Sequence, residues 1–193
     1  MADPNRKGPW TVVQSTYAIA DRWLRLRHDV VSLPDGRTLP PQPVIEHPDW
    51  VDVIALTADH NSVLVDQYRH SVRQVRTEFP AGTVDGAETP LAAIKRELLE
   101  ETGYASDDWR LLGTAPVYPA LQTNRILSFL ALNVRKVTAQ DLDEGELIRA
   151  YELTFTEFIE KVESGTIELP ALQLAGLWWL RSWTHEAKLL RLG

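Results

Sequence analysis

Apolar and polar side chains alternate along the first part of the chain, a pattern that is typical of β-strands. Between residues 11 and 45 this alternation runs around a turn at Pro34-Asp35-Gly36, which predicts a small antiparallel sheet. Three closely spaced prolines, at positions 40, 41 and 43, then interrupt the pattern. We therefore expect a first domain at residues 1–45, formed by this sheet, and a second domain at residues 46–193.

The rest of the chain alternates between short strand patterns and longer helical patterns, which predicts an α/β fold. Strands are predicted at residues 51–58, 62–68, 109–114, 125–134 and 147–153, and a long terminal helix is predicted to begin at Pro170. The sequence shows no internal repeat and no low-complexity tract, so the second domain is expected to have one continuous core.

Two helices are predicted from the residues at their ends. Thr89 is a good N-cap, a proline follows at the first helical position, and Gly103 comes directly after the last turn. These signals place a helix at residues 90–102. Thr154 and Glu157 have the spacing of a capping box, which places a second helix after Thr154.

Composition narrows the classes of function. The formal net charge is -7 and the pI is about 5.2, so the surface is unsuited to a phosphate backbone and no nucleic-acid partner is expected. The absence of cysteine excludes disulfides, thiolate zinc sites and thiol nucleophiles. The first residues lack the apolar stretch of a signal peptide, and no later run approaches membrane-spanning length. We therefore expect a cytoplasmic protein without a membrane partner.

Three carboxylates lie close together in the helix predicted at residues 90–102. Glu97, Glu100 and Glu101 stand at positions i, i+3 and i+4, so they share one face near its C-terminus. Each like-charged pair costs roughly 0.2–0.5 kcal/mol, and the helix dipole adds roughly 0.3–1 kcal/mol. Arg96 can offset one charge, but a hard divalent cation would offset more. The alternative is an ordinary solvated helix face.

These glutamates belong to a longer motif. It consists of Gly-Thr-Val-Asp-Gly-Ala-Glu at residues 82–88, a spacer of seven residues, and Arg-Glu-Leu-Leu-Glu-Glu-Thr-Gly-Tyr at residues 96–104. Every fixed position of the Nudix box is matched, and the one variation is Tyr104, where many members carry an aliphatic residue. The chain therefore resembles the Nudix hydrolases, and a pattern with so many fixed positions rarely arises by chance.

The resemblance implies a fold and a metal site. The implied fold is the Nudix α/β/α sandwich around a mixed sheet, here preceded by the small N-terminal antiparallel sheet. Magnesium is the implied cofactor, with manganese as an alternative and two or three ions in each site. The implied metal ligands are Glu97, Glu100, Glu101 and the backbone carbonyl of Ala81. Glu100 and Arg96 also belong to the implied catalytic set, Arg96 as the partner that orients a neighbouring glutamate.

Three further features resemble one subgroup, the ADP-ribose pyrophosphatases and related nucleoside-diphosphate-sugar hydrolases. They are Glu-Phe-Pro-Ala-Gly at residues 78–82, Pro119 at 15 residues after Tyr104, and Asp-Gln-Tyr-Arg at residues 66–69. The implied reaction is magnesium-dependent hydrolysis of ADP-ribose to AMP and ribose 5-phosphate. GDP-mannose or another nucleoside diphosphate sugar is the alternative substrate, and a non-catalytic nucleotide-sugar sensor is the alternative from another class of protein.

The resemblance also implies substrate contacts. Arg69, at the end of a predicted strand, matches the arginine that contacts the diphosphate in related enzymes, and the alternative is an exposed arginine paired with a nearby carboxylate. The other implied contacts are Trp23, Arg25, Trp50 and Pro119. The first three are candidates for stacking on the base, although packing in the core is the alternative for each tryptophan.

The base that deprotonates the attacking water is expected outside the box, because the metal ligands are already committed to cations. The acidic segment at residues 141–146 resembles the loop that supplies this glutamate in the subgroup, and Gly145 would give it freedom to close. Glu144 matches the implied base best and Glu146 is the second choice. The alternative is a solvated acidic turn.

The N-terminal sheet is implied to be a dimerisation element. In the subgroup that this chain resembles, the sheet is exchanged between two protomers, whose residues combine in each active site. A small sheet at residues 11–45 would bury too little apolar surface to be stable alone. We therefore expect a domain-swapped homodimer that acts on a small nucleotide-sugar substrate.

Overall fold

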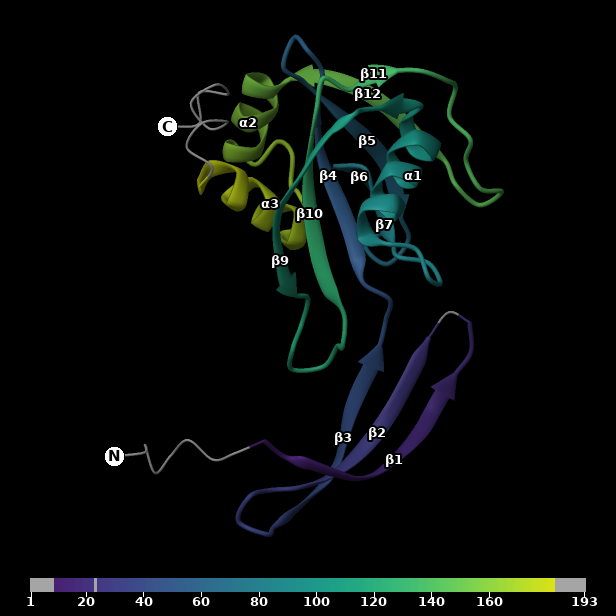
Figure 1. Cartoon of the computed structure of the whole chain (residues 1–193), viewed down its shortest axis with the longest axis vertical. Coiled ribbons are helices and arrows are strands. Elements are labelled where there is room, and N and C mark those ends of the chain that lie inside the picture. Colours follow the sequence, from purple (N-terminus) through teal and green to yellow (C-terminus); the bar gives the residue numbers. More distant parts are fainter. Residues whose placement is uncertain (1–8, 23, 183–193) are drawn as a thin grey trace. The chain divides into compact units, whose positions relative to one another are not determined.

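A computed structural model describes residues 9–22 and 24–182 of the chain, shown in Figure 1. The described residues divide into two compact units. One contains the chain up to His47 together with residues 116–124, and the other contains residues 48–115 and the chain from Arg125 onward. The sequence did not indicate that residues 116–124 belong with the N-terminal sheet.

The N-terminal unit is a three-stranded antiparallel sheet, as the alternating pattern predicted. Its strands, in the order β1-β2-β3, are β1 (Thr11–Ala20), β2 (Arg25–Ser32) and β3 (Thr38–Glu46). The segment at residues 116–124 lies against the end of β3, where the Ile45 N–H donates to the Leu121 carbonyl at 2.8 Å. Every residue of β1 is exposed.

The second unit is built on a mixed sheet with the strand order β12-β5-β4-β10-β9. These strands are β12 (Ile148–Thr154), β5 (Asn61–Arg69), β4 (Trp50–Leu56), β10 (Arg125–Leu132) and β9 (Asp108–Pro116). Strands β4 and β10 run parallel, whereas β5 is antiparallel to both β4 and β12. Two short strands, β8 (Tyr104–Ala105) and β11 (Arg135–Lys136), pair with each other beside it.

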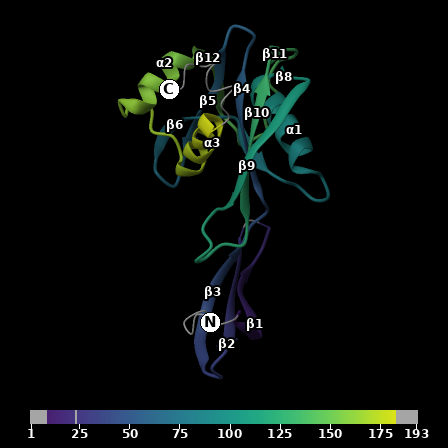
Figure 2. The same cartoon turned by 60° about the vertical axis from the view of Figure 1, so that its left-hand side comes forward.

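Helices cover both faces of this sheet. Figures 1 and 2 show α1 (Pro90–Thr102) on one face and α2 (Phe155–Glu163) with α3 (Ala171–Ser182) on the other. Because successive side chains of a strand point to opposite faces, β4 supplies both layers of the core. Val53 packs with the α1 residues Ile94 and Leu98, whereas Ile54 packs with Leu180 of α3. This is the α/β/α arrangement expected from the sequence.

Strands β4 and β5 diverge after a short pairing, and the site is built where they separate. They pair only at Ala55–Val63 and Leu56–Ser62. Beyond that point β6 (Gln74–Glu78) pairs with β5, and β7 (Ala81–Thr83) pairs with β4. The chain crosses between these two short strands through Phe79 and Pro80. We call residues 79–82 the fork segment.

Both ends of α1 and the start of α2 match the sequence prediction. The Thr89 hydroxyl accepts a hydrogen bond from the Ala92 N–H at 3.2 Å, and Gly103 ends α1 in the left-handed region at φ 76°. The Thr154 hydroxyl accepts from the Glu157 N–H at 3.2 Å, which caps α2. No helix in the described ranges is long and apolar enough to cross a membrane.

Candidate active site

A pocket of about 380 Å³ opens beside the fork segment, and we call it the acidic pocket. The fork segment, the last turns of α1 and the loop before β12 contribute its lining. Its carboxylates are Asp85, Glu97, Glu100, Glu101, Asp141, Asp143 and Glu146, and two arginines, Arg69 and Arg96, also line it. The three box glutamates predicted as metal ligands are therefore in one pocket with the fork segment.

Glu101 is the most enclosed of these carboxylates. Its side chain lies under the fork segment, the residue is 5% exposed, and one oxygen accepts a hydrogen bond from the Ala81 N–H at 3.1 Å. Burial is the main reason that the pKa of Glu101 rises to about 8; the charges of Glu97 and Glu146 add to the rise, while the Ala81 N–H opposes it. Such a carboxyl is poised to accept a positive partner.

Glu97 lies directly against the backbone of the fork segment. A Cβ atom at Gly82 would come within 2.1 Å of the Glu97 carboxyl group, so only glycine fits there without displacing the glutamate. Burial also raises the pKa of Glu97, although the nearby Arg96 guanidinium opposes this rise. Gly82, the first residue of the box, therefore allows the fork segment to approach α1 closely.

Arg96 organises the outer side of the acidic pocket. Its guanidinium donates to Glu88 at 3.0 Å and to Glu100 at 2.9 Å, and it forms an ion pair with Glu97 at 2.9 Å. The hydrogen bond to Glu88 is the main reason that the pKa of Arg96 lies well above its ordinary value. This geometry suits a residue that orients neighbouring glutamates.

The donors in the acidic pocket fit a hard divalent cation. Carboxylate oxygens are the ligands that magnesium prefers, and Glu97 and Glu101 are held at reduced solvation, where a cation is the natural partner. Within the described residues, no three acidic or histidine side chains converge tightly enough to enclose an ion as they stand. The Arg96 guanidinium holds both Glu97 and Glu100.

The loop before β12 brings one of the two predicted bases to the pocket. Glu146 lines the acidic pocket, and its backbone N–H donates to the Asp143 carbonyl at 2.9 Å. Glu144 is exposed at the tip of the turn and is not among the pocket residues. The loop is attached to α1, because the Asp141 N–H donates to the Glu100 carbonyl at 2.9 Å. Of the two predicted bases, Glu146 thus lines the acidic pocket and Glu144 does not.

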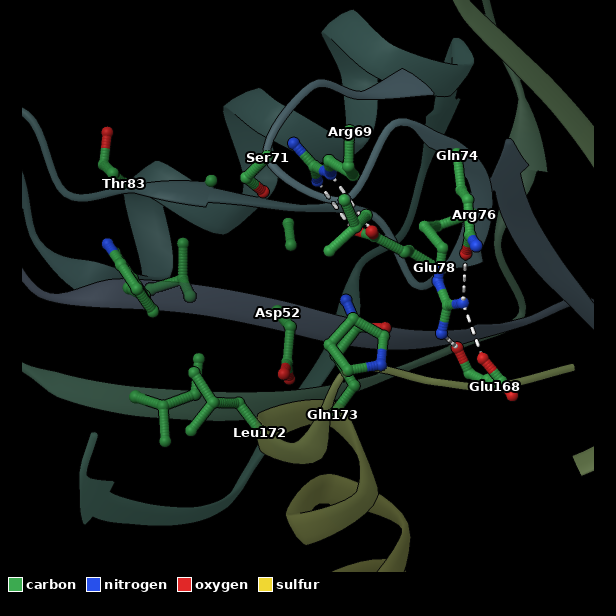
Figure 3. A pocket seen from close by; sticks show the side chains of 17 residues that line it. Asp52, Arg69, Ser71, Gln74, Arg76, Glu78, Thr83, Glu168, Leu172 and Gln173 are labelled. Carbon is green, nitrogen blue, oxygen red and sulfur yellow. Dashed lines mark hydrogen bonds and ion pairs between the residues drawn. The ribbon is translucent and has the colours of Figure 1, made fainter. Parts of the chain in front are cut away.

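A larger pocket of about 860 Å³ adjoins the acidic pocket, and we call it the side pocket (Figure 3). The two pockets share Arg69 and the chain from Ala81 to Thr83. Trp50 lines the side pocket, as do Asp52, Ser71, Val72, Arg76, Ile126, Glu168, Pro170, Leu172 and Gln173. The sequence identified Trp50 but missed the rest, although an aspartate inside the apolar strand β4 was a signal for Asp52.

Arg69 lies between the two pockets. Its guanidinium donates to both carboxylate oxygens of Glu78, at 3.0 and 2.6 Å, as the dashed lines in Figure 3 show. The pairing with a nearby carboxylate, which was the alternative to a ligand contact, is therefore present. The Arg69 side chain is still 41% exposed and lines both pockets, so its remaining N–H groups can reach a bound anion.

The other predicted substrate contacts are not in the second unit. Arg25 and Pro119 belong to the N-terminal unit. The Arg25 guanidinium donates to Glu46 at 2.8 Å and lies 4.7 Å from the centre of the Tyr17 ring. Trp23 lies outside the described residues. Of the predicted contacts, Trp50 thus lines the side pocket and Arg69 lines both pockets.

Comparison with known proteins identifies the family. Residues 46–171 match the NUDIX domain family, and this match spans the acidic pocket, α1 and the sheet. The chain belongs to the Nudix family. Residues 10–41 match the nucleoside diphosphate sugar hydrolase N-terminal domain, which corresponds to the strands of the N-terminal unit. Nudix enzymes typically use a divalent metal ion, which agrees with the donors in the acidic pocket.

Several curated proteins are similar to this Nudix chain. The methanol dehydrogenase activator of Bacillus methanolicus is 31% identical over 156 residues, covering 80% of this chain and 84% of that protein. The ADP-ribose pyrophosphatase of Bacillus subtilis (strain 168) is 30% identical, covering 69% of this chain and 72% of that protein. A crystal structure of an ADP compounds hydrolase has the same fold, with a TM-score of 0.78 at 17% identity over 91% of this chain and 94% of that one. The protein is thus a Nudix pyrophosphatase.

Proposed function

We propose that this Nudix pyrophosphatase hydrolyses the diphosphate bond of ADP-ribose, with AMP and ribose 5-phosphate as products. The observation that carries the proposal is the acidic pocket. Its box glutamates lie in the same pocket as Arg69, and the pocket itself adjoins the side pocket. The similarity to an ADP-ribose pyrophosphatase over most of both chains supports this substrate. The N-terminal match to nucleoside diphosphate sugar hydrolases supports the wider substrate class.

The proposed cofactor is magnesium, with manganese as the alternative and two or three ions in each site. The ligands would be the carboxylates of Glu97, Glu100 and Glu101 and the backbone carbonyl of Ala81. When bound, such ions neutralise the charge of a diphosphate and lower the pKa of a bound water. The chain's own contribution is to hold these oxygens together in spite of their repulsion, through Arg96 and the Ala81 N–H.

The remaining roles follow from position. Arg69 would donate charge-assisted hydrogen bonds to the diphosphate, because it lies where the two pockets meet. Glu146 would accept the proton of the attacking water, because it lines the acidic pocket beside the box glutamates. Arg96 would orient Glu97 and Glu100. Glu144, at the exposed tip of the turn, becomes the second choice for the base.

The side pocket would take one of the two groups that flank the diphosphate. Its volume of about 860 Å³ falls within the range of roughly 300–1,000 Å³ that is usual for small-molecule sites. Its two guanidinium groups are each paired with a carboxylate, Arg69 with Glu78 and Arg76 with Glu168. Because these charges are paired, the side pocket suits an uncharged base or sugar. The phosphates would bind at the acidic pocket.

A substrate panel tests the proposal. ADP-ribose, ADP-glucose and GDP-mannose would be assayed with magnesium, with manganese and with a chelator. We expect the highest kcat/KM with ADP-ribose and no turnover with the chelator. GDP-mannose is the second candidate, because a GDP-mannose pyrophosphatase of Yersinia enterocolitica is 37% identical over 94 residues. Tight binding of any of these compounds without turnover would instead indicate a nucleotide-sugar sensor.

The metal ligands are tested by charge-neutral variants. We expect Glu97→Gln and Glu101→Gln each to lower kcat/KM by more than about 100-fold, beyond the range usual for groups that only support ligands. Both variants should fold, since each removes a charge from a crowded acidic surface. Glu160→Gln, at an exposed position of α2, is the matched control and should retain full activity. Wild-type turnover in both site variants at saturating magnesium would contradict the ligand assignment.

We further infer that the protein acts as a homodimer. Strand β1 is exposed along its whole length, and its outward side chains include Val12, Val13, Tyr17 and Ile19, each at least 41% exposed. An apolar edge strand of this kind is unfavourable in water, because it leaves both apolar surface and backbone groups without partners. A second copy of the chain would cover it.

A further inference from the structure

Gln173 makes an unusual pair of hydrogen bonds from α3 to the fork segment. Its side-chain carbonyl accepts from the Phe79 N–H at 2.9 Å, and its side-chain amide donates to the Phe79 carbonyl at 3.0 Å. One side chain thus satisfies both backbone groups of one residue, as a neighbouring strand would. Gln173 is 4% exposed and Phe79 is 1% exposed, so both bonds lie away from water.

The identity of residue 173 is informative because packing alone would favour an apolar side chain. The buried residues of α3 are Gln173, Gly176 and Leu180, and they face the sheet. Burying an amide costs free energy unless its groups are hydrogen-bonded, and here Phe79 provides the bonds. The polar side chain at residue 173 is therefore explained by its hydrogen bonds to the fork segment and not by packing in the core.

The fork segment connects this pair of hydrogen bonds, which we call the Gln173 clamp, to the box glutamates. The Pro80 carbonyl accepts from the Val53 N–H at 3.0 Å, and the Ala81 N–H donates to Glu101 at 3.1 Å. The next residue, Gly82, lies against Glu97. The backbone is therefore anchored by Gln173 at one end and by the glutamates of α1 at the other. Figure 3 shows Gln173 and Asp52 among the residues that line the side pocket.

We propose that Gln173 is a positioning residue for the divalent-metal site, which it serves by holding the fork segment through Phe79. The proposal rests on the metal ligands proposed above. Its role is indirect. Gln173 fixes the backbone two residues before Ala81, and this keeps the Ala81 backbone at hydrogen-bond distance from the Glu101 carboxylate. Without the clamp the fork segment gains freedom, and the site loses its preformed arrangement.

The test measures metal binding in the absence of substrate. Free Mn²⁺ is followed by electron paramagnetic resonance while it is titrated with full-length wild-type protein, Gln173→Leu or Gln173→Glu. Leucine has a similar size but makes neither hydrogen bond, whereas glutamate keeps the acceptor for the Phe79 N–H and loses the donor. We expect Gln173→Leu to weaken Mn²⁺ binding by about 10–100-fold, the usual effect of losing a group that supports a ligand. Gln173→Glu should weaken it less.

Two controls separate this role from general stability and from failure of the metal site. Leu177→Ala removes packing from the same helix but none of the hydrogen bonds to the fork segment, so it should lower the melting temperature and leave Mn²⁺ affinity unchanged. Glu101→Gln should abolish Mn²⁺ binding. If Glu101→Gln loses the metal but both Gln173 variants bind it like wild type, Gln173 is only structural and the proposal is wrong. If Glu101→Gln binds metal normally, the proposed metal site fails, and the role of Gln173 fails with it.

Discussion

At the scale of single residues, the catalytic base is a choice between two glutamates that Gly145 separates. Glu146 lines the acidic pocket, whereas Glu144 is exposed at the tip of the turn. We predict that Glu146→Gln lowers kcat by roughly 10²–10⁴-fold with little change in KM, the range usual for loss of a general base. Glu144→Gln is the matched control and should stay near the wild-type kcat. Steady-state kinetics decide, and the reverse pattern would restore Glu144 as the base.

Asp52 gives a prediction about stability and pH. It is 1% exposed, and neither carboxylate oxygen has a hydrogen-bond partner of normal geometry among the described residues. Burial raises its pKa from 3.8 to about 7, although the nearby Ser128 hydroxyl opposes the rise. Because the folded state holds the proton more tightly, the contribution of Asp52 to stability is greatest below pH 3.8 and is lost as the pH rises to about 7. Asp52→Asn should therefore be more stable than wild type at pH 8, by roughly 2–4 kcal/mol.

Urea unfolding at several pH values measures this difference. The two free energies of unfolding should converge near pH 4, because Asp52 is then largely protonated in the folded protein and partly so in the unfolded chain. Asp107→Asn, whose side chain is 89% exposed, should follow the wild-type profile throughout. Parallel profiles for wild type and Asp52→Asn would show that this carboxyl is not shifted.

Single residues also show how far the sequence alone can predict the site. Glu97, Glu100 and Glu101 were identified because their grouping is local and follows helical spacing. Gln173 could not be identified this way, since its partner Phe79 lies 94 residues earlier and only the folded sheet brings them together. The choice between the two glutamates of the loop likewise depended on a turn whose direction no local pattern specifies.

At the scale of elements, the end of α1 gives a prediction about stability. Gly103 has φ 76°, and a Cβ atom there would lie 2.2 Å from the Thr138 carbonyl oxygen. Gly103→Ala therefore combines backbone strain with a backbone clash, and we expect it to cost at least roughly 1–3 kcal/mol of stability. Gly165→Ala is the control, because Gly165 has φ 75° but nothing within 4 Å of its Cβ position. Thermal unfolding should show a clearly larger loss at Gly103; equal losses would contradict the clash.

The sequence predicted the longer elements well and the shortest ones poorly. The ends of α1 were predictable because Thr89 and Gly103 act locally, through a cap and a left-handed turn. Strands β6 and β7 were missed. They are short, and β7 exists only because residues 81–83 pair with the start of β4, a contact that periodicity does not record.

At the scale of the whole molecule, the exposed strand β1 predicts an oligomeric state. We expect light scattering of the purified protein to give the mass of a dimer. The double variant Val13→Lys and Ile19→Lys should lower this mass toward a monomer, because it places two charges on the apolar strand. Thr16→Lys, which adds a charge at a polar position of the same strand, should remain dimeric. A wild-type monomer at micromolar concentration would contradict the proposed dimer.

The parallel pairing of β4 with β10 also determines when the chain can fold during its synthesis. Strand β4 lies at the centre of the sheet, and along one whole edge it pairs with β10. The β10 residues, 125–132, emerge from the ribosome much later than β4. Until then the strand from Val51 to Leu56 presents an unpaired, largely apolar edge to solvent. Non-local pairing of this kind slows folding, so a nascent chain halted before Arg125 should depend on chaperones and aggregate without them.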